Sequence, residues 1–369
     1  MPSQINKKPK SENSKDSFFI AVNGYSGFRS HYSALFASPA YKRLYIIEGG
    51  PGTGKRRSMS EIAAAAEARG GSVRYIYCSS DPDSLDGIIL ENGDRRVAVL
   101  DGTAPHTRPP AFPGAIDEVI NLGDFWDSER LRARREEIVR LTEKKQDAYR
   151  HAYAHLSLAG KIDELLNAQL SECLDHEKLK KAAHRVALTL RESNAPGEQL
   201  RYYRACSMKG QVTLPPPAGA SLINVTDYLG SGHFFLDALR EELRQNGKYN
   251  YHLIPSCYTD KKTNGIYLPQ DNLMFFNGES SGAKKTINMH RFILAEEIKR
   301  ARPALRRLIA MHEETIERAL AHLRTAGAHH FALEEIYGSA MNFPQKEAFV
   351  QGLVARILAV LFPAADAAT

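Results

Sequence analysis

The sequence predicts an α/β fold of two tandem halves, each a three-layer unit with a parallel sheet and each followed by long helices. Three observations predict it. Apolar strand segments alternate with helical segments, which is typical of parallel sheets covered on both faces. The same order of segments occurs twice along the 369 residues. Each half also closes with a long segment in which apolar residues follow the 3.6-residue helical period.

A glycine-rich loop joins a strand to a helix in the first half. The strand covers residues 44–47, the helical stretch covers 59–68, and the segment between them contains Gly49-Gly50-Pro51-Gly52-Thr53-Gly54-Lys55. This is the spacing and the context of a phosphate-binding loop, or P-loop. Backbone N–H groups and the helix N-terminus attract an anion there, and the lysine can reach the outer phosphates of a nucleotide. The loop therefore predicts P-loop NTPase-like halves; the alternative is a glycine turn that only connects strand to helix.

Arg56 departs from the P-loop pattern, which has a serine or threonine hydroxyl at this place to ligate Mg²⁺. A guanidinium within about 4 Å of a divalent cation would be repelled by several kcal/mol at an effective dielectric constant of about 20. Ser58 lies about 200° further around the helix and cannot replace the hydroxyl. Either the arginine turns away or it pairs with phosphate, and both outcomes predict weakened Mg²⁺ dependence. The residues expected to bind the nucleotide are Gly49, Gly50, Pro51, Gly52, Thr53, Gly54, Lys55, Arg56 and Arg57.

Candidate catalytic and metal-binding residues follow the apolar strand 97–100. Asp101 ends this strand, where a carboxylate can hold Mg²⁺ directly or through water; a turn aspartate before glycine is the alternative. Thr103 and His106 lie just past the strand end, where open α/β sheets bind ligands. We expect Lys55, Asp101 and His106 to be catalytic and Asp101 and Thr103 to be metal ligands, with a surface histidine as the alternative for His106. Asp124 is a further carboxylate candidate or a helix N-cap.

The second half repeats the first with a degenerate loop. Gly52 and Gly54 recur 178 positions later as Gly230 and Gly232, and residues 120–122 recur 167 positions later as 287–289. His233 stands where the first half has its lysine, so we expect this half to have lost nucleotide binding.

The repeat sets the expected boundaries. Residues 1–16 form a disordered tail, 17–195 the P-loop half with its helical extension, and 196–369 the degenerate half with C-terminal helices. Further expected strands cover 72–77, 249–254 and 273–276, with a variable loop before the strand that ends in Asp101 or Asn277. Helices are expected over 128–158, 162–191 and 296–324, and a last one near Pro344.

The composition is that of an ordinary globular protein, with 43% hydrophobic and 25% charged residues. The net charge of +6 is modest, and no aromatic-interleaved basic stripe indicates a nucleic-acid partner. The four cysteines contain no C-x-x-C pair, and no segment has the apolar length of a membrane span. We therefore expect a reduced, cytoplasmic protein without a membrane partner.

With both halves in view, the chain resembles an uncharacterised bacterial (Firmicutes-type) family of tandem P-loop ATPases over nearly its whole length. The marks of the resemblance are the 49–55 loop, Asp101-Gly102-Thr103-Ala104-Pro105-His106, Pro113-Gly114-Ala115 and Ile120-Asn121-Leu122-Gly123-Asp124-Phe125-Trp126. The resemblance implies the fold and a nucleotide site. The chain departs from the family at His233, where members carry a second phosphate loop, and at Arg56.

The sequence favours a protein that binds ATP in its first half, with Mg²⁺ as a candidate cofactor and with weak or absent hydrolysis. The guanine-reading Asn-Lys-x-Asp motif is absent, which favours adenine. One alternative is a phosphotransferase whose Pro-rich loop, 107–114, receives a small acceptor. Another is a non-catalytic scaffold whose helices, 128–191 and 296–324, bind a protein partner.

Overall fold

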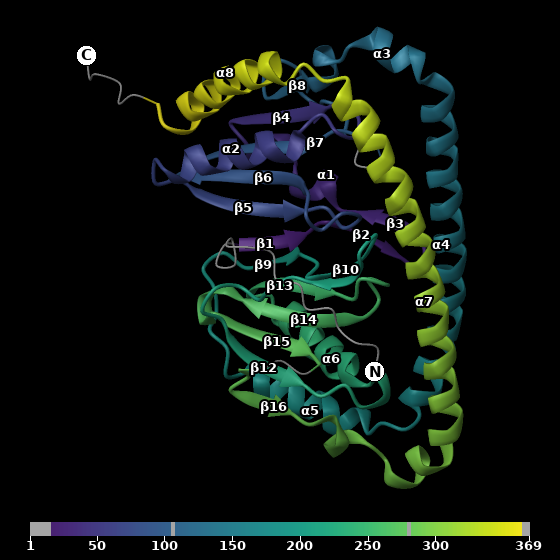
Figure 1. The fold of residues 1–369 in the computed structure, drawn as a ribbon. Coiled ribbons are helices and arrows are strands. Elements are labelled where there is room, and N and C mark those ends of the chain that lie inside the picture. The colour runs from purple at the N-terminus through teal and green to yellow at the C-terminus, as the bar shows by residue number, and fades with distance from the viewer. Residues whose placement is uncertain (1–15, 105–107, 279–281, 364–369) are drawn as a thin grey trace, which may run out of the picture.

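Two six-stranded sheets lie next to each other, and a pair of long helices runs along the side of both (Figure 1). The computed structural model describes residues 16–104, 108–278 and 282–363. The predicted tail lies outside these residues except for Asp16, which begins the first strand. At this level the expected α/β fold with two sheets and long helices is confirmed.

The two sheets have the same strand order. In the order of pairing, the first contains β1 (Asp16–Phe19), β5 (Ser72–Tyr77), β6 (Leu85–Asn92), β7 (Arg95–Asp101), β4 (Arg43–Glu48) and β8 (Asp117–Asn121). The second contains β9 (Gly197–Leu200), β13 (Asn250–Pro255), β14 (Thr263–Leu268), β15 (Leu273–Asn277), β12 (Ser221–Val225) and β16 (Lys285–Ile287). The repeat seen in the sequence is therefore a repeat of topology.

The expectation of parallel sheets holds only in part, because β6 and β14 run antiparallel to both neighbours while the other pairs in the two sheets are parallel. Both strands lie in segments that the sequence analysis took for variable loops. A parallel crossover needs about a dozen residues or more, and only the two residues Gly93 and Asp94 separate β6 from β7. So short a connection makes a hairpin, and each sheet is mixed.

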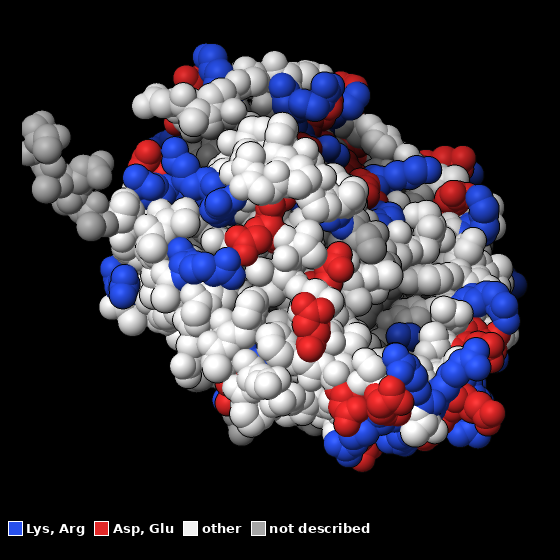
Figure 2. All heavy atoms as spheres, turned by 90° about the horizontal axis from the view of Figure 1, so that it is seen from above, with Lys and Arg blue, Asp and Glu red and all other residues white. Residues whose placement is uncertain are grey.

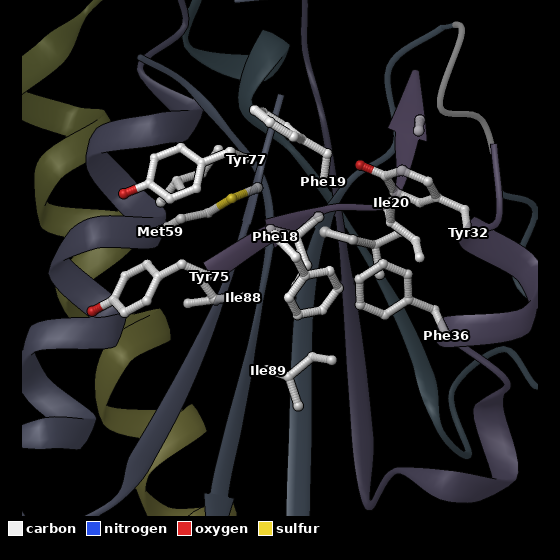
Figure 3. Packing of buried hydrophobic residues seen from close by; sticks show 14 of the residues in the cluster. Phe18, Phe19, Ile20, Tyr32, Phe36, Met59, Tyr75, Tyr77, Ile88 and Ile89 are labelled. Atoms are coloured by element: carbon white, nitrogen blue, oxygen red, sulfur yellow. The ribbon is translucent and has the colours of Figure 1, made fainter. Parts of the chain in front are cut away.

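Short hairpins join the halves at the sheet edges. They are formed by β2 (Ala21–Gly24) with β3 (Gly27–Ser30), and by β10 (Arg204–Ser207) with β11 (Gly210–Thr213). Phe19 and Tyr202 exchange backbone hydrogen bonds of 2.8 and 2.9 Å across the junction. The Asn23 amide donates to the carbonyl of Cys206 at 2.8 Å. The largest apolar core is continuous across this junction, and Figure 3 shows the part of it formed around β1, β5 and β6.

The helices after the loops are α2 (Lys55–Glu67) and α6 (Gly232–Asn246). The long pair is α4 (Arg135–Ser171) and α7 (Ala295–Ser339), which pack against each other in opposite directions (Figure 1). The predicted break between 158 and 162 is wrong, since α4 continues through it. The short helical segments are α1 (Tyr32–Leu35), η1 (Ser38–Ala40), η2 (Leu122–Phe125), α3 (Ser128–Ala133), η3 (Tyr228–Gly230), η4 (Pro269–Asp271) and η5 (Met289–Phe292).

The closing helix of each half covers the other half. The helix α5 (His176–Ala187) packs on α6, burying Leu179 and Ala183 in the core of the second sheet. The helix α8 (Phe343–Leu361) packs on α2 and β7, burying Leu353 and Ile357 in the core that contains the first sheet. The predicted boundary near residue 195 thus separates the two sheets in sequence, while the helices cross it.

On the face seen in Figure 2, Lys and Arg lie beside Asp and Glu toward the top and the right, while the lower left is mostly uncharged. Among the residues that the structure describes, no helix has the length and apolar character needed to cross a bilayer.

Candidate functional site

The glycine loop leaves the end of β4 and enters α2. Gly49, Gly52 and Gly54 have φ angles of +138°, +74° and +79°, which L side chains rarely adopt. Gly54 is the N-cap of α2, so the free N–H groups of the first helical turn lie next to the loop. The Thr53 hydroxyl, which is buried, donates to the Gly50 carbonyl at 3.0 Å and holds the turn in place.

Lys55 folds over this loop. Its Nζ donates to the carbonyls of Gly49 and Gly50 at 2.7 and 2.9 Å, and it lies 3.7 Å from Oδ2 of Asp101. Asp101 reaches this position because β7 pairs with β4, with Asp101 in register with Ile47. The predicted lysine and the predicted strand-end carboxylate are therefore brought together at the same sheet edge.

Thr103 completes this cluster. Its backbone N–H donates to Oδ1 of Asp101 at 2.8 Å, and its hydroxyl lies in hydrogen-bond contact with the same carboxylate and 3.0 Å from the Gly49 carbonyl. His106 lies outside the described residues. Asp124 is exposed and accepts a 2.6 Å bond from the amide of Asn121, which is itself the N-cap of η2.

The two arginines after Lys55 differ in direction. Arg56 is exposed and lines the cavity described next. Arg57 instead bonds Glu61 and Glu347, each at 2.9 Å, on the outer side of α2. The Ser58 hydroxyl is buried and donates to the Gly54 carbonyl at 3.2 Å.

A cavity of about 680 Å³ opens from the loop. Besides the loop and Asp101, it is lined by the connection after β5 and by the facing sides of α4 and α7. Residues from these walls include Ser80, Asp81, Lys145, Tyr149, His330 and Glu334. Burial raises the pKa of Tyr149 to about 12 and lowers the pKa of Lys145, so the tyrosine is a neutral hydroxyl donor at physiological pH.

Sequence reasoning missed these cavity walls. Residues 78–84 follow the carboxyl end of β5 and are polar, which is the signal that could have located them. The residues of α4 and α7 are distant in sequence and carry no local motif.

Helix α7 presses directly on the loop. A Cβ placed on Gly52 would lie 2.4 Å from the carbonyl oxygen of Glu334, and a Cβ on Gly50 would lie 3.8 Å from the ring of Tyr337. The carboxylate of Glu334 lies 3.6 Å from Nε2 of His330. The pKa of Glu334 is lowered by its bond to His330, and further by Lys55 and the Gly52 N–H. The loop therefore has a negatively charged neighbour on the α7 side.

The second loop occupies the equivalent place between β12 and α6 but is filled by its own side chains. Oδ1 of Asp227 accepts the Gly232 N–H at 3.0 Å. His233 is buried, with Nδ1 2.9 Å from the Gly230 carbonyl, and burial lowers its pKa to about 3. This loop thus has no cation where the first loop has Lys55.

Comparisons with protein-family models, with curated proteins and with solved structures found no match to this chain. In the first half the loop offers backbone N–H donors next to the Lys55 ammonium and the Asp101 carboxylate, and all of them border an open cavity. Such a set is suited to a polyanion that carries a larger uncharged or polar group.

Proposed function

We propose that the first glycine loop binds the phosphates of ATP and that the protein hydrolyses ATP weakly or not at all. The observation that carries this proposal is the position of Lys55. It lies at the N-terminus of α2, over a loop that contains positive-φ glycines and 3.7 Å from Asp101, and it lines a cavity of about 680 Å³. Small-molecule sites usually have volumes of about 300–1,000 Å³. Membership of the tandem P-loop ATPase family that the sequence resembles is part of this proposal.

The second half, in this proposal, is a structural counterpart without a nucleotide. At the second loop, the Asp227 carboxylate already accepts the Gly232 N–H and would repel an anion. His233 is neutral and stands in place of a lysine. The expected stoichiometry is therefore one nucleotide per chain.

The residues near the first loop could hold Mg²⁺ only if water and phosphate oxygens supplied most of its ligands. Asp101 offers one carboxylate, and its Oδ1 is already bonded to the N–H and hydroxyl of Thr103. Within the described residues, no group of three or more His, Cys, Asp or Glu could hold a metal ion. Mg²⁺ keeps several waters and often takes one or two carboxylates together with substrate phosphates. Asp101 would hold such an ion, while Arg56 supplies positive charge instead of a hydroxyl ligand.

A phosphotransferase is the second candidate, favoured by the polar residues that line the cavity outside the loop. Ser80 and Asp81, which follow β5, and Tyr149 of α4 line the cavity. A small hydroxyl-bearing acceptor beside these residues would lie on the cavity side of the phosphates, next to the carboxyl ends of the strands.

Calorimetry of the purified chain with ATP, ADP and GTP, each with and without Mg²⁺, tests the proposal. We expect ATP to bind with a stoichiometry of one and with little dependence on Mg²⁺. ADP release that needs an added acceptor would favour the phosphotransferase. Absence of binding by all three nucleotides would contradict the proposal and favour the scaffold that binds a protein through its helices.

A further inference from the structure

Lys346 is a buried lysine beside the first loop. It lies in the first turn of α8, is 0% exposed, and its Nζ has no hydrogen-bond partner among the residues that the structure describes. A Cβ placed on Gly54 would lie 3.3 Å from this Nζ and 3.7 Å from Cε. The ammonium end of the side chain therefore points toward the last glycine of the loop, at the N-terminus of α2.

The carboxylates around Lys346 are already paired with another residue. Its electrostatic neighbours are Glu61, Glu347 and Arg57. Both glutamates bond the guanidinium of Arg57 at 2.9 Å. The positive end of the α2 dipole adds to the repulsion. Among the described residues Lys346 thus has no direct ion pair, and Glu61 and Glu347, which both bond Arg57, act on its ammonium only at longer range.

Two other lysines, the partly buried Lys262 and the exposed Lys209, show what an ion-paired lysine looks like in this chain. Lys262 bonds Asp163 at 2.6 Å, and Lys209 bonds Asp81 and Asp83, each at 2.6 Å. Burying an ammonium without such a partner is strongly unfavourable. A ligand with negative charge at the loop would give the Lys346 ammonium a direct counter-charge and a hydrogen-bond acceptor.

We infer that Lys346 is a second phosphate-binding cation, which α8 places beside Gly54 to contact the phosphate chain of a nucleoside triphosphate. This inference rests on the proposed function. Two lysines from opposite ends of the chain, Lys55 and Lys346, then neutralise the phosphates. The second ammonium provides charge that Mg²⁺ would otherwise provide, which agrees with a loop that lacks its hydroxyl ligand.

The test is Lys346→Met, which keeps the length and apolar stem and removes the charge. Calorimetry without Mg²⁺ is expected to show ATP binding at least about tenfold weaker, with adenosine binding unchanged. The melting temperature of the nucleotide-free variant should rise, because an unpaired buried charge is gone. If the role of Lys346 is purely structural, the variant should change the melting temperature but not the ratio of the ATP affinity to the adenosine affinity.

Lys262→Met is the matched control, since it removes the ammonium that bonds the Asp163 carboxylate. It should lower the melting temperature and leave ATP affinity unchanged. If Lys346→Met does not fold, Lys346→Gln serves in its place. Equal ATP affinity in wild type and the Lys346 variant would overturn the inference and leave the proposed function intact. Failure of the wild type to bind ATP would overturn both.

Discussion

Single residues decide the difference between the two loops. Lys55 and His233 follow equivalent strands and begin equivalent helices, yet Lys55 lies over two loop carbonyls and His233 is buried and neutral. Both positions could be predicted from the sequence, because strand, loop and helix are contiguous in each half. Sequence analysis could also place Asp101 and Thr103, since β7 pairs with β4. It could not find Glu334 or Lys346, whose contacts with the loop come from the far end of the chain.

His233 makes stability depend on pH. Its folded pKa of about 3 is below the ordinary value of 6.5, so the unfolded chain binds the proton first as the pH falls. The stabilisation is present above pH 6.5 and decreases between pH 6.5 and pH 3. We expect the free energy of unfolding to fall by about 1.5–2 kcal/mol from this residue between pH 6.5 and pH 5. Urea titrations of wild type and His233→Gln at both pH values check this, and an unchanged pH slope in the variant would contradict it.

Arg56→Ser tests whether Arg56 weakens metal-assisted chemistry. The new hydroxyl gives Mg²⁺ a ligand and removes a repelling charge, so Mg²⁺ affinity in the ATP complex and Mg²⁺-dependent ATP hydrolysis should both rise. Adding Asp101→Asn should cancel the gain, because Asp101 is the proposed carboxylate on the metal side. Wild-type protein that already hydrolyses ATP with strong Mg²⁺ dependence, and loses activity on Arg56→Ser, would reverse this interpretation.

At the scale of elements, the long helices are anchored to the sheets by a repeated glycine contact. Gly160 in α4 and Gly327 in α7 are separated by 167 positions, the offset of the sequence repeat. A Cβ on Gly160 would lie 2.9 Å from Cβ of Tyr25, in the β2–β3 turn. A Cβ on Gly327 would lie 2.8 Å from Cβ of Met208, in the β10–β11 turn. The sequence predicts that a helix ends at residue 158, near Gly160. In the structure α4 continues through this position, and the glycine lets the helix approach Tyr25 closely.

Alanine at either glycine is therefore expected to destabilise the protein by about 1–3 kcal/mol, since the added methyl group overpacks a contact with side-chain stems. Gly352→Ala is the matched control. Gly352 is exposed in α8 with no atom near its Cβ position, so alanine there should stabilise by about 0.5–1 kcal/mol. Thermal unfolding of the three variants measures this. A neutral Gly160→Ala would show that α4 can move away from Tyr25.

At the scale of the whole molecule, the halves depend on each other through α5 and α8. Local periodicity predicted these helices, but it could not show that each packs on the opposite sheet. That arrangement follows from the length of α4 and α7, which carry the chain from one sheet to the other (Figure 1). It also explains why the loop of the first half contacts residues of the second.

Separate fragments 1–195 and 196–369 should therefore fail to fold alone. Each would expose the apolar surface that α8 or α5 covers in the intact chain, including the partners of Leu353, Ile357 and Leu179. Co-expressed fragments should associate and purify together. Circular dichroism melts measure the outcome, and a cooperative transition of fragment 1–195 alone at the temperature of the full chain would refute the exchange of helices.

The central claim is that one loop binds ATP and the other does not, and paired titrations of Lys55→Ala and His233→Ala test it most directly. Calorimetry of the wild type should give one ATP per chain. Lys55→Ala should weaken binding by about tenfold to a hundredfold, because it removes a cation that contacts phosphate. His233→Ala should bind as the wild type does. Two ATP molecules per chain, equal losses in both variants, or full binding by Lys55→Ala would contradict the account.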